Sequence, residues 1–357
     1  MEHALALGRR GLGTTWPNPA VGCVLVREDR VVGRGWTQPG GRPHAEVMAL
    51  GQAGAAARGA TAYVTLEPCA HHGQTPPCAD ALVAAGVARV VVALTDPDPR
   101  VNGQGLARLR AAGVAVTDGV GADRARVDQA GFLSRVTRGR PMVTVKLASS
   151  FDGRIATASG EGRWITGTGA RRLVHAERMR HDAVMVGAGT VRADDPDLRV
   201  RGLGARRQPV RVVLSRGLDL PERSRLALTA TEVPVWLLHG NRVDPARAAA
   251  WDAAGARRFT IPVAYGVIDP VAALKALGEQ GITRVFCEGG GSLAAALIGD
   301  GLVDEVIGFT AGLALGAEGR PSLAALGIGA LAEAPRFELV EARAVDGDVM
   351  HRWRRPA

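Results

Sequence analysis

The residue types that can hold a catalytic metal are gathered in the first 80 residues of the chain. His44-Ala45-Glu46 is followed by Cys69 and then by Cys78. A catalytic zinc ion takes three protein ligands and keeps one position for water, and one imidazole with two thiolates meets that need. Zinc brings the pKa of this water near neutrality, and a carboxylate two residues after the histidine can accept its proton. We therefore predict a zinc ion held by His44, Cys69 and Cys78, with Glu46 as the acid and base of a hydrolytic deamination.

The segments around these residues alternate between helix and strand patterns. The periodicities predict a helix, a two-stranded hairpin and then alternating helices and strands, at 2–10, 21–27, 30–36, 45–57, 61–66, 78–85, 89–94, 103–112, 114–117 and 122–137. Strands separated by helices of this length are typical of βαβ units in a largely parallel sheet. A buried pair of thiols with a histidine at a helix cap is the alternative to a metal site. The metal site is favoured because all three residues stand at strand-to-helix junctions.

A second unit is predicted to begin after residues 137–141, where glycine and proline interrupt both periodicities. Its strands and helices are expected at 142–148, 168–180, 183–187, 210–214, 234–239, 268–278, 283–287, 292–299, 303–310 and 336–353. The strand at 283–287 leads through three glycines, 289–291, into a helix. Glycines let a pyrophosphate approach the backbone, and a helix N-terminus offers free N–H groups. The run lacks the GxGxxG spacing, which argues against a Rossmann domain.

Composition restricts the remaining classes of function. A chain of 357 residues predicts about two domains. The formal net charge of +9 comes almost wholly from arginine, and only 4% of residues are aromatic, so anionic small molecules suit this chain better than nucleic acid. The sequence shows neither a long apolar run nor a secretory signal, so we expect a cytoplasmic protein without membrane contact. Disulfides are not the default in that compartment.

Two local motifs narrow the interpretation. Residues 67–78 read EPCAHHGQTPPC, with eight residues between Cys69 and Cys78 where zinc deaminases more often have two. Residues 18–23 read NPAVGC. Both motifs closely resemble the deaminase half of the RibD family, the bifunctional pyrimidine deaminase/reductases of riboflavin biosynthesis. The resemblance implies a cytidine-deaminase-like α/β/α domain over residues 1–140. It also implies a substrate contact for Asn18, which is otherwise a turn residue before a proline.

The resemblance continues through residues 141–357, which look like the reductase half of that family, with a dihydrofolate-reductase-like α/β fold. The matching motifs are KLASSFDGR at 146–154, SGEGRWIT at 159–166, GTVRADDPDL at 189–198 and CEGGGSL at 287–293. The resemblance implies NADPH contacts at Ser149, Trp164, Thr190, Asp194, Gly290, Gly291 and Ser292, and substrate contacts at Arg178, Leu198, Arg201 and Glu288. Lys146 and Asp194 are candidate polar groups near the reacting ribose carbon. A solvated surface charge is the alternative for each arginine.

Two positions depart from the family pattern, since Gln74 stands where the family often has a cation and Gly162 where it often has serine. Taken whole, the resemblance implies zinc-dependent deamination of 2,5-diamino-6-ribosylamino-4(3H)-pyrimidinone 5′-phosphate. NADPH-dependent reduction of the ribosyl side chain would follow and give 5-amino-6-ribitylaminouracil 5′-phosphate. It also implies a homo-oligomer formed through the reductase domain. The alternatives are a single-function zinc deaminase with a regulatory nucleotide-binding C-terminal domain, and a nucleic-acid module.

Overall fold

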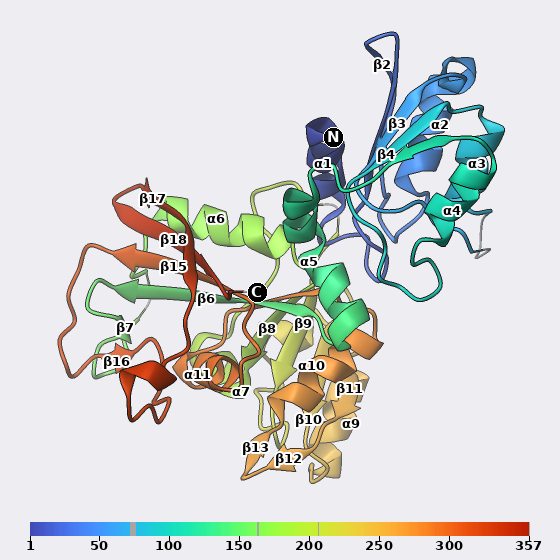
Figure 1. Ribbon diagram of the computed structural model, residues 1–357. Coiled ribbons are helices and arrows are strands. Elements are labelled where there is room, and N and C mark those ends of the chain that lie inside the picture. The colour runs from blue at the N-terminus through green and yellow to red at the C-terminus, as the bar shows by residue number, and fades with distance from the viewer. Residues whose placement is uncertain (72–75, 163, 206, 357) are drawn as a thin grey trace. The chain divides into compact units, whose positions relative to one another are not determined.

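The computed structural model describes residues 1–71, 76–162, 164–205 and 207–356 (Figure 1). Gln74, one of the two positions that depart from the family pattern, lies outside these residues. The chain divides into two compact units, Met1–Arg140 with Gln280–Thr283, and Pro141–Glu279 with Arg284–Ala357. Within the part of the chain that the structure describes, no helix combines the length and the apolar character that crossing a membrane requires.

The first unit is a five-stranded sheet with its helices on both faces. Its elements are α1 (Glu2–Gly8), η1 (Arg9–Gly11), β1 (Gly22–Arg27), β2 (Arg30–Trp36), α2 (Ala45–Ala53), η2 (Gly54–Ala57), β3 (Thr61–Val64), α3 (Cys78–Ala84), β4 (Arg89–Val92), α4 (Gln104–Ala111), β5 (Ala115–Thr117) and α5 (Ala122–Arg138). The strand order is β2-β1-β3-β4-β5. Strands β3, β4 and β5 run parallel, whereas β1 is antiparallel to both β2 and β3. The sheet is mixed rather than largely parallel, because the hairpin reverses the chain and places β1 between β2 and β3.

Glycines in the hairpin let two helices approach the sheet from opposite sides. A Cβ atom at Gly22 would lie 1.9 Å from the carbonyl oxygen of Ala4 in α1. A Cβ atom at Gly35 would lie 2.2 Å from the carbonyl oxygen of Ala45 in α2. Gly35 pairs with Cys23, the residue after Gly22, and successive strand residues face opposite sides of a sheet. Helix α1 therefore covers one face and α2 the other.

The second unit is built on a nine-stranded sheet of order β11-β10-β9-β8-β14-β6-β15-β18-β17. Its elements are β6 (Met142–Ser150), β7 (Arg154–Ala156), α6 (Thr168–Met179), β8 (Ala183–Gly187), α7 (Ala188–Asp194), β9 (Val210–Leu214), α8 (Arg225–Leu228), β10 (Val235–His239), α9 (Pro245–Ala253), β11 (Arg257–Thr260), β12 (Val263–Ala264), β13 (Val267–Ile268), α10 (Pro270–Glu279), β14 (Arg284–Cys287), α11 (Gly291–Gly299), β15 (Glu305–Ala311), β16 (Arg320–Pro321), η3 (Leu331–Glu333), β17 (Glu338–Val345) and β18 (Asp348–Arg354). The strands from β11 to β15 in this order run parallel, and β18 and β17 complete the sheet antiparallel.

The core of the second unit explains its continuous apolar strands. Val184, Val213, Leu237 and Phe286, from four neighbouring parallel strands, all belong to one buried cluster. Parallel strands covered on both faces are expected to read as such apolar runs. Helix α7 begins directly after β8 and carries two of the predicted cofactor contacts, although the sequence patterns did not predict a helix there. Helix α9 was likewise not predicted.

Candidate active sites

The predicted metal ligands converge in the first unit. His44 is the N-terminal cap of α2, with extended backbone angles, and Cys78 is the first residue of α3. Cys69 lies in the segment that follows β3. The Nδ1 atom of His44 lies 3.3 Å from the Sγ atom of Cys78 and 3.7 Å from that of Cys69. The three ligand atoms lie within 4.8 Å of one another, and all four cysteines of the chain are free of disulfides.

These spacings fit a tetrahedral zinc ion. Zn–S and Zn–N bonds of about 2.3 and 2.1 Å at a tetrahedral angle separate sulfur from nitrogen by about 3.6 Å. The observed separations of 3.3 and 3.7 Å bracket that value. The backbone N–H of Cys78 donates a hydrogen bond to the Sγ atom of Cys69 at 3.3 Å. Such a bond favours the thiolate, which is the form of cysteine that binds zinc.

Burial and hydrogen bonding divide the protons of this cluster unequally. The hydrogen bond with the Cys78 side chain is the main cause that lowers the pKa of Cys69 to about 4. The same bond, together with burial, raises the pKa of Cys78. Glu46 is 3% exposed, and burial raises its pKa to about 7. The site therefore favours one thiolate, together with a carboxyl group that exchanges its proton near neutral pH, as a general acid and base must.

Glu67, the first residue of the EPC sequence, has a supporting role that the sequence did not indicate. Its buried carboxylate accepts four backbone hydrogen bonds. One oxygen accepts from Asp96 at 3.1 Å and Gly103 at 2.9 Å, and the other from Gly105 at 2.8 Å and Leu106 at 3.3 Å. Glu67 lies two residues before Cys69. Its hydrogen bonds thus tie the backbone that leads to this ligand to the segment after β4 and to the start of α4. It holds the backbone around the metal ligands and is not itself among them.

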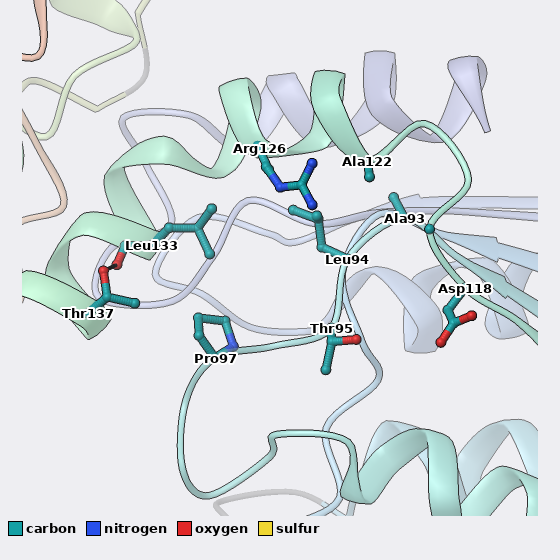
Figure 2. A pocket seen from close by; sticks show the side chains of 10 residues that line it. Ala93, Leu94, Thr95, Pro97, Asp118, Ala122, Arg126, Leu133 and Thr137 are labelled. Carbon is teal, nitrogen blue, oxygen red and sulfur yellow. Dashed lines mark hydrogen bonds between the residues drawn. The ribbon is translucent and has the colours of Figure 1, made fainter. Parts of the chain in front are cut away.

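The segment after β4 contains a second buried carboxyl group that the sequence did not single out. Asp96 is 6% exposed, and burial raises its pKa to about 6. Its neighbours Leu94, Thr95 and Pro97 line a hollow of about 470 Å³, opposite Arg126 of α5 (Figure 2). None of the predicted site residues, the zinc ligands included, lines this hollow.

Asn18 is held by the segment that leads to His44. Its side-chain amide donates a hydrogen bond of 2.9 Å to the carbonyl oxygen of Gly41. Gly41 has a φ of +86°, and a Cβ atom there would lie 2.3 Å from the Asn18 amide nitrogen. The bond uses one of the two amide N–H groups and leaves the side-chain oxygen for another partner. A role in the turn and a role toward a substrate are therefore compatible.

In the second unit, α7 and the glycine run at the start of α11 meet. The hydroxyl group of Thr190 accepts a hydrogen bond of 3.2 Å from the backbone N–H of Gly290, the N-terminal cap of α11. A Cβ atom at Gly291 would lie 3.1 Å from the carbonyl oxygens of both Pro321 and Ser322. Only glycine therefore fits comfortably where this helix begins. Asp194 lies at the last position of α7, and Ser292 is exposed in the first turn of α11.

Arg178 and Glu288, both predicted to contact substrate, form an ion pair with each other. The Nε atom of Arg178 donates to one carboxylate oxygen at 2.5 Å and an Nη atom donates to the other at 3.0 Å. The remaining Nη atom donates to the carbonyl oxygen of Arg199 at 2.8 Å. Lys146 lies near this pair, and burial lowers its pKa while the Glu288 charge opposes the shift. With these bonds in place, Arg178 holds Glu288, and Arg201 is the more exposed cation for a phosphate.

The other predicted residues of this unit occupy contrasting surroundings. Leu198 has a φ of +59° and its side chain is buried in the core, so only its backbone can meet a ligand. Trp164 is 72% exposed. Ser149 lies half-buried near the end of β6. A Cβ atom at Gly162 would lie 2.5 Å from the carbonyl oxygen of Ile155, so this loop has no room for the serine that the family often has there.

Comparisons with known proteins assign both units. The family model described as "Cytidine and deoxycytidylate deaminase zinc-binding region" matches residues 1–94, and the "RibD C-terminal domain" model matches residues 141–351. The "Riboflavin biosynthesis protein RibD" of Escherichia coli (strain K12) is 43% identical over 361 residues, which cover 98% of this chain and 96% of that protein. The chain belongs to the RibD family.

Other RibD relatives agree over nearly the whole length. The RibD protein of Aquifex aeolicus (strain VF5) is 39% identical, covering 93% of this chain and 91% of its own. The structure of Acinetobacter baumannii RibD, form 1, has a TM-score of 0.90 at 41% identity and covers 100% of this chain and 98% of its own. A Thermotoga maritima structure named as a diaminohydroxyphosphoribosylaminopyrimidine deaminase/5-amino-6-(5-phosphoribosylamino)uracil reductase has a TM-score of 0.87 at 32% identity, and covers 100% of this chain and 97% of its own. The chain is accordingly an enzyme of riboflavin biosynthesis with a zinc-dependent deaminase domain and an NADPH-dependent reductase domain.

Proposed function

We propose that this RibD chain carries out two consecutive reactions on one phosphorylated pyrimidine. Residues 1–140 hydrolyse the 2-amino group of 2,5-diamino-6-ribosylamino-4(3H)-pyrimidinone 5′-phosphate, and ammonia leaves. Residues 141–357 then reduce the ribosyl side chain to ribityl, which gives 5-amino-6-ribitylaminouracil 5′-phosphate. The observation that carries the proposal is the His44, Cys69 and Cys78 cluster with its tetrahedral spacing, in a chain whose remainder matches the reductase domain.

In the deaminase, the chain's own residues hold the metal and move protons. When bound, zinc acts as a Lewis acid that lowers the pKa of a water molecule. Glu46 accepts a first proton from the attacking water and delivers it to the ring nitrogen. It then takes the remaining hydroxyl proton and delivers it to the amino group, which leaves as ammonia. Burial raises the pKa of Glu46 and so helps it to hold a proton between the two transfers. Asn18 orients the ring through its free amide oxygen.

In the reductase, NADPH supplies the hydride and the chain positions the reactants. We assign Ser149, Trp164, Thr190, Asp194, Gly290, Gly291 and Ser292 to the cofactor. Arg201, Glu288 and the backbone of Leu198 face the substrate, and Arg178 holds Glu288 in place. Lys146 is the polar group that we place near the reacting ribose carbon. Its lowered pKa makes it a more ready proton donor than an ordinary lysine.

The resemblance to the family also supports a homo-oligomer through the reductase domain, a cytoplasmic location and no nucleic-acid or membrane partner. The direct test incubates the full chain with the diamino substrate, zinc and NADPH. Ammonia release followed by an equimolar oxidation of NADPH is the expected result. Ammonia release without NADPH oxidation would favour the single-function deaminase, whose second domain only binds a nucleotide.

A further inference from the structure

Helix α6 directs three side chains toward the loops of the proposed reductase site. Arg171, His175 and Arg178 are spaced by four and then three residues, which places them in a row along one face of the helix. The neighbouring Ala170, Leu173 and Val174 pack into the core of the second unit. The helix is therefore anchored on one side while this polar row meets the loops on another.

Arg171 contacts the loop that carries Trp164. The guanidinium carbon of Arg171 lies 4.4 Å from the centre of the Trp164 ring, and an Nη atom donates a 2.7 Å hydrogen bond to the carbonyl oxygen of Thr166. Trp164 has a φ of +69° and is 72% exposed. A bulky residue is uncommon in this left-handed region and needs surrounding contacts to stay there. Arg171 supplies such contacts and leaves much of the indole surface open to a planar ligand.

His175 and Arg178 hold the segment that carries Arg201. The Nδ1 atom of His175 accepts a 3.2 Å hydrogen bond from the backbone N–H of Arg201. Arg178 donates to the carbonyl oxygen of Arg199, two residues earlier. Two points of the segment, Arg199 and Arg201, are thus held by one helix. The bond requires a neutral ring with its proton on Nε2, and burial with two nearby cations lowers the pKa of His175 in agreement.

We propose that α6 is the positioning element of the reductase, in which Arg171 sets Trp164 for NADPH and His175 sets Arg201 for the substrate phosphate. The inference rests on the roles proposed above for Trp164 and Arg201. It separates two functions along one helix, because each residue acts on a different loop. Neither Arg171 nor His175 is a catalytic residue in this account.

The test measures the KM for each substrate of the reductase in full-length variants, following NADPH oxidation with the deaminated intermediate. We expect Arg171→Met to raise the KM for NADPH about five- to tenfold and to leave the KM for the pyrimidine within about twofold, as for the loss of one or two weak contacts. Arg171→Lys keeps a cation over the ring and should recover much of the loss. Arg172→Met, an exposed arginine next along the same helix, is the matched control and should change neither KM.

The variants of His175 test the other half of the proposal, in which the KM for the pyrimidine changes and the KM for NADPH does not. His175→Leu removes the acceptor and should raise the KM for the pyrimidine about five- to tenfold with NADPH binding unchanged. His175→Gln returns an acceptor oxygen and should restore the KM to within about twofold. Quenching of tryptophan fluorescence by NADPH, corrected with Trp164→Phe, should be weakened by Arg171→Met and not by His175→Leu. Deaminase activity of the same samples checks that the first domain of each variant is folded. The melting temperature of each variant checks that the second domain is folded.

Three results overturn the inference in distinguishable ways. If Trp164→Ala and Arg201→Ala raise the KM for NADPH and pyrimidine respectively while the α6 variants do not, the positioning role is wrong and the site assignment stands. If those two substitutions leave both KM values unchanged, the proposed contacts are wrong and the role of α6 falls with them. An equal rise of both KM values in Arg171→Met and His175→Leu would also refute separate roles.

Discussion

Replacing Glu67 by glutamine tests whether the carboxylate of the EPC sequence is a structural acceptor. The substitution keeps the shape of the side chain and turns one carboxylate oxygen into an NH2 group. If the NH2 takes the place nearer Asp96 and Gly103, their backbone N–H groups meet a donor instead of an acceptor. The opposite rotamer would do the same to Gly105 and Leu106. Either arrangement leaves two of the four backbone donors unpaired.

The cost can be worked out from these bonds. Leaving a buried donor without a partner costs about 1–3 kcal/mol, so two such donors cost roughly 2–6 kcal/mol. For a domain near 140 residues, each kcal/mol shifts the melting temperature by about 3–5 °C. The deaminase domain of Glu67→Gln should therefore melt roughly 6–30 °C below that of the parent chain.

Differential scanning calorimetry of the zinc-loaded full chain measures this shift. Hydrogen exchange over residues 95–107 should accelerate in the same variant, because its backbone N–H groups lose their acceptor. Glu28→Gln is the matched control, since the Glu28 side chain is 82% exposed and its substitution should move the melting temperature by less than about 1 °C. A deaminase transition in Glu67→Gln within 2 °C of the parent, by the scale of about 3–5 °C per kcal/mol, would refute the acceptor role.

Four further outcomes follow from the two sites. Glu46→Ala should lose deamination by about 10²–10⁴-fold with zinc still bound, and zinc loss by elemental analysis would contradict its role beyond the ligands. Cys78→Ser should lose zinc and deamination while NADPH-dependent reduction persists, and joint loss of both activities would argue against independent sites. Zinc affinity should fall by at least about tenfold per pH unit as the pH is lowered through 7, because the raised pKa values of Cys78 and His44 mean that binding must expel their protons; a flat profile in chelator competition would count against this. Arg178→Leu should destabilise the second domain by about 3–5 kcal/mol in urea unfolding, and adding Glu288→Leu should recover part of that loss, since the single change leaves a buried charge unpaired.

The sequence predicted well those features that depend on neighbouring residues. The hairpin at 21–36 was predicted from strand patterns on both sides of Glu28-Asp29, and both of these turn residues adopt positive φ. The approach of His44, Cys69 and Cys78 was predicted from their chemistry and junction positions. Helix α9 could have been predicted too, because Asp244 precedes Pro245 and caps the backbone N–H of Ala246. Helix α7 is short and follows β8 without a loop, so its pattern merges with that of the strand.

Features that depend on distant residues could not be predicted in this way. Strand β14 inserts between β8 and β6, and no local pattern encodes that order. Arg178 and Glu288 are 110 positions apart, so their ion pair comes from the packing of α6 against the end of β14. The partners of Glu67 lie 29–39 positions further along the chain. In each case the residue type was visible and its partner was set by the tertiary fold.

The glycines under α2 have a consequence for the zinc site. At Gly33 and Gly35 the backbone of α2 packs directly against the backbone of β2, with no side chain between them. A change of side-chain rotamer at these positions therefore cannot move α2, which carries Glu46 and begins after His44. The backbone that leads from His44 to Glu46 therefore has little freedom to move relative to β2. A set of one imidazole and two thiols suits a small four-coordinate ion, and it disfavours magnesium or manganese, which require six oxygen-rich ligands. Close packing between a strand and a helix thus keeps His44 and Glu46 next to each other, while the donor set itself excludes the other divalent ions of a cell.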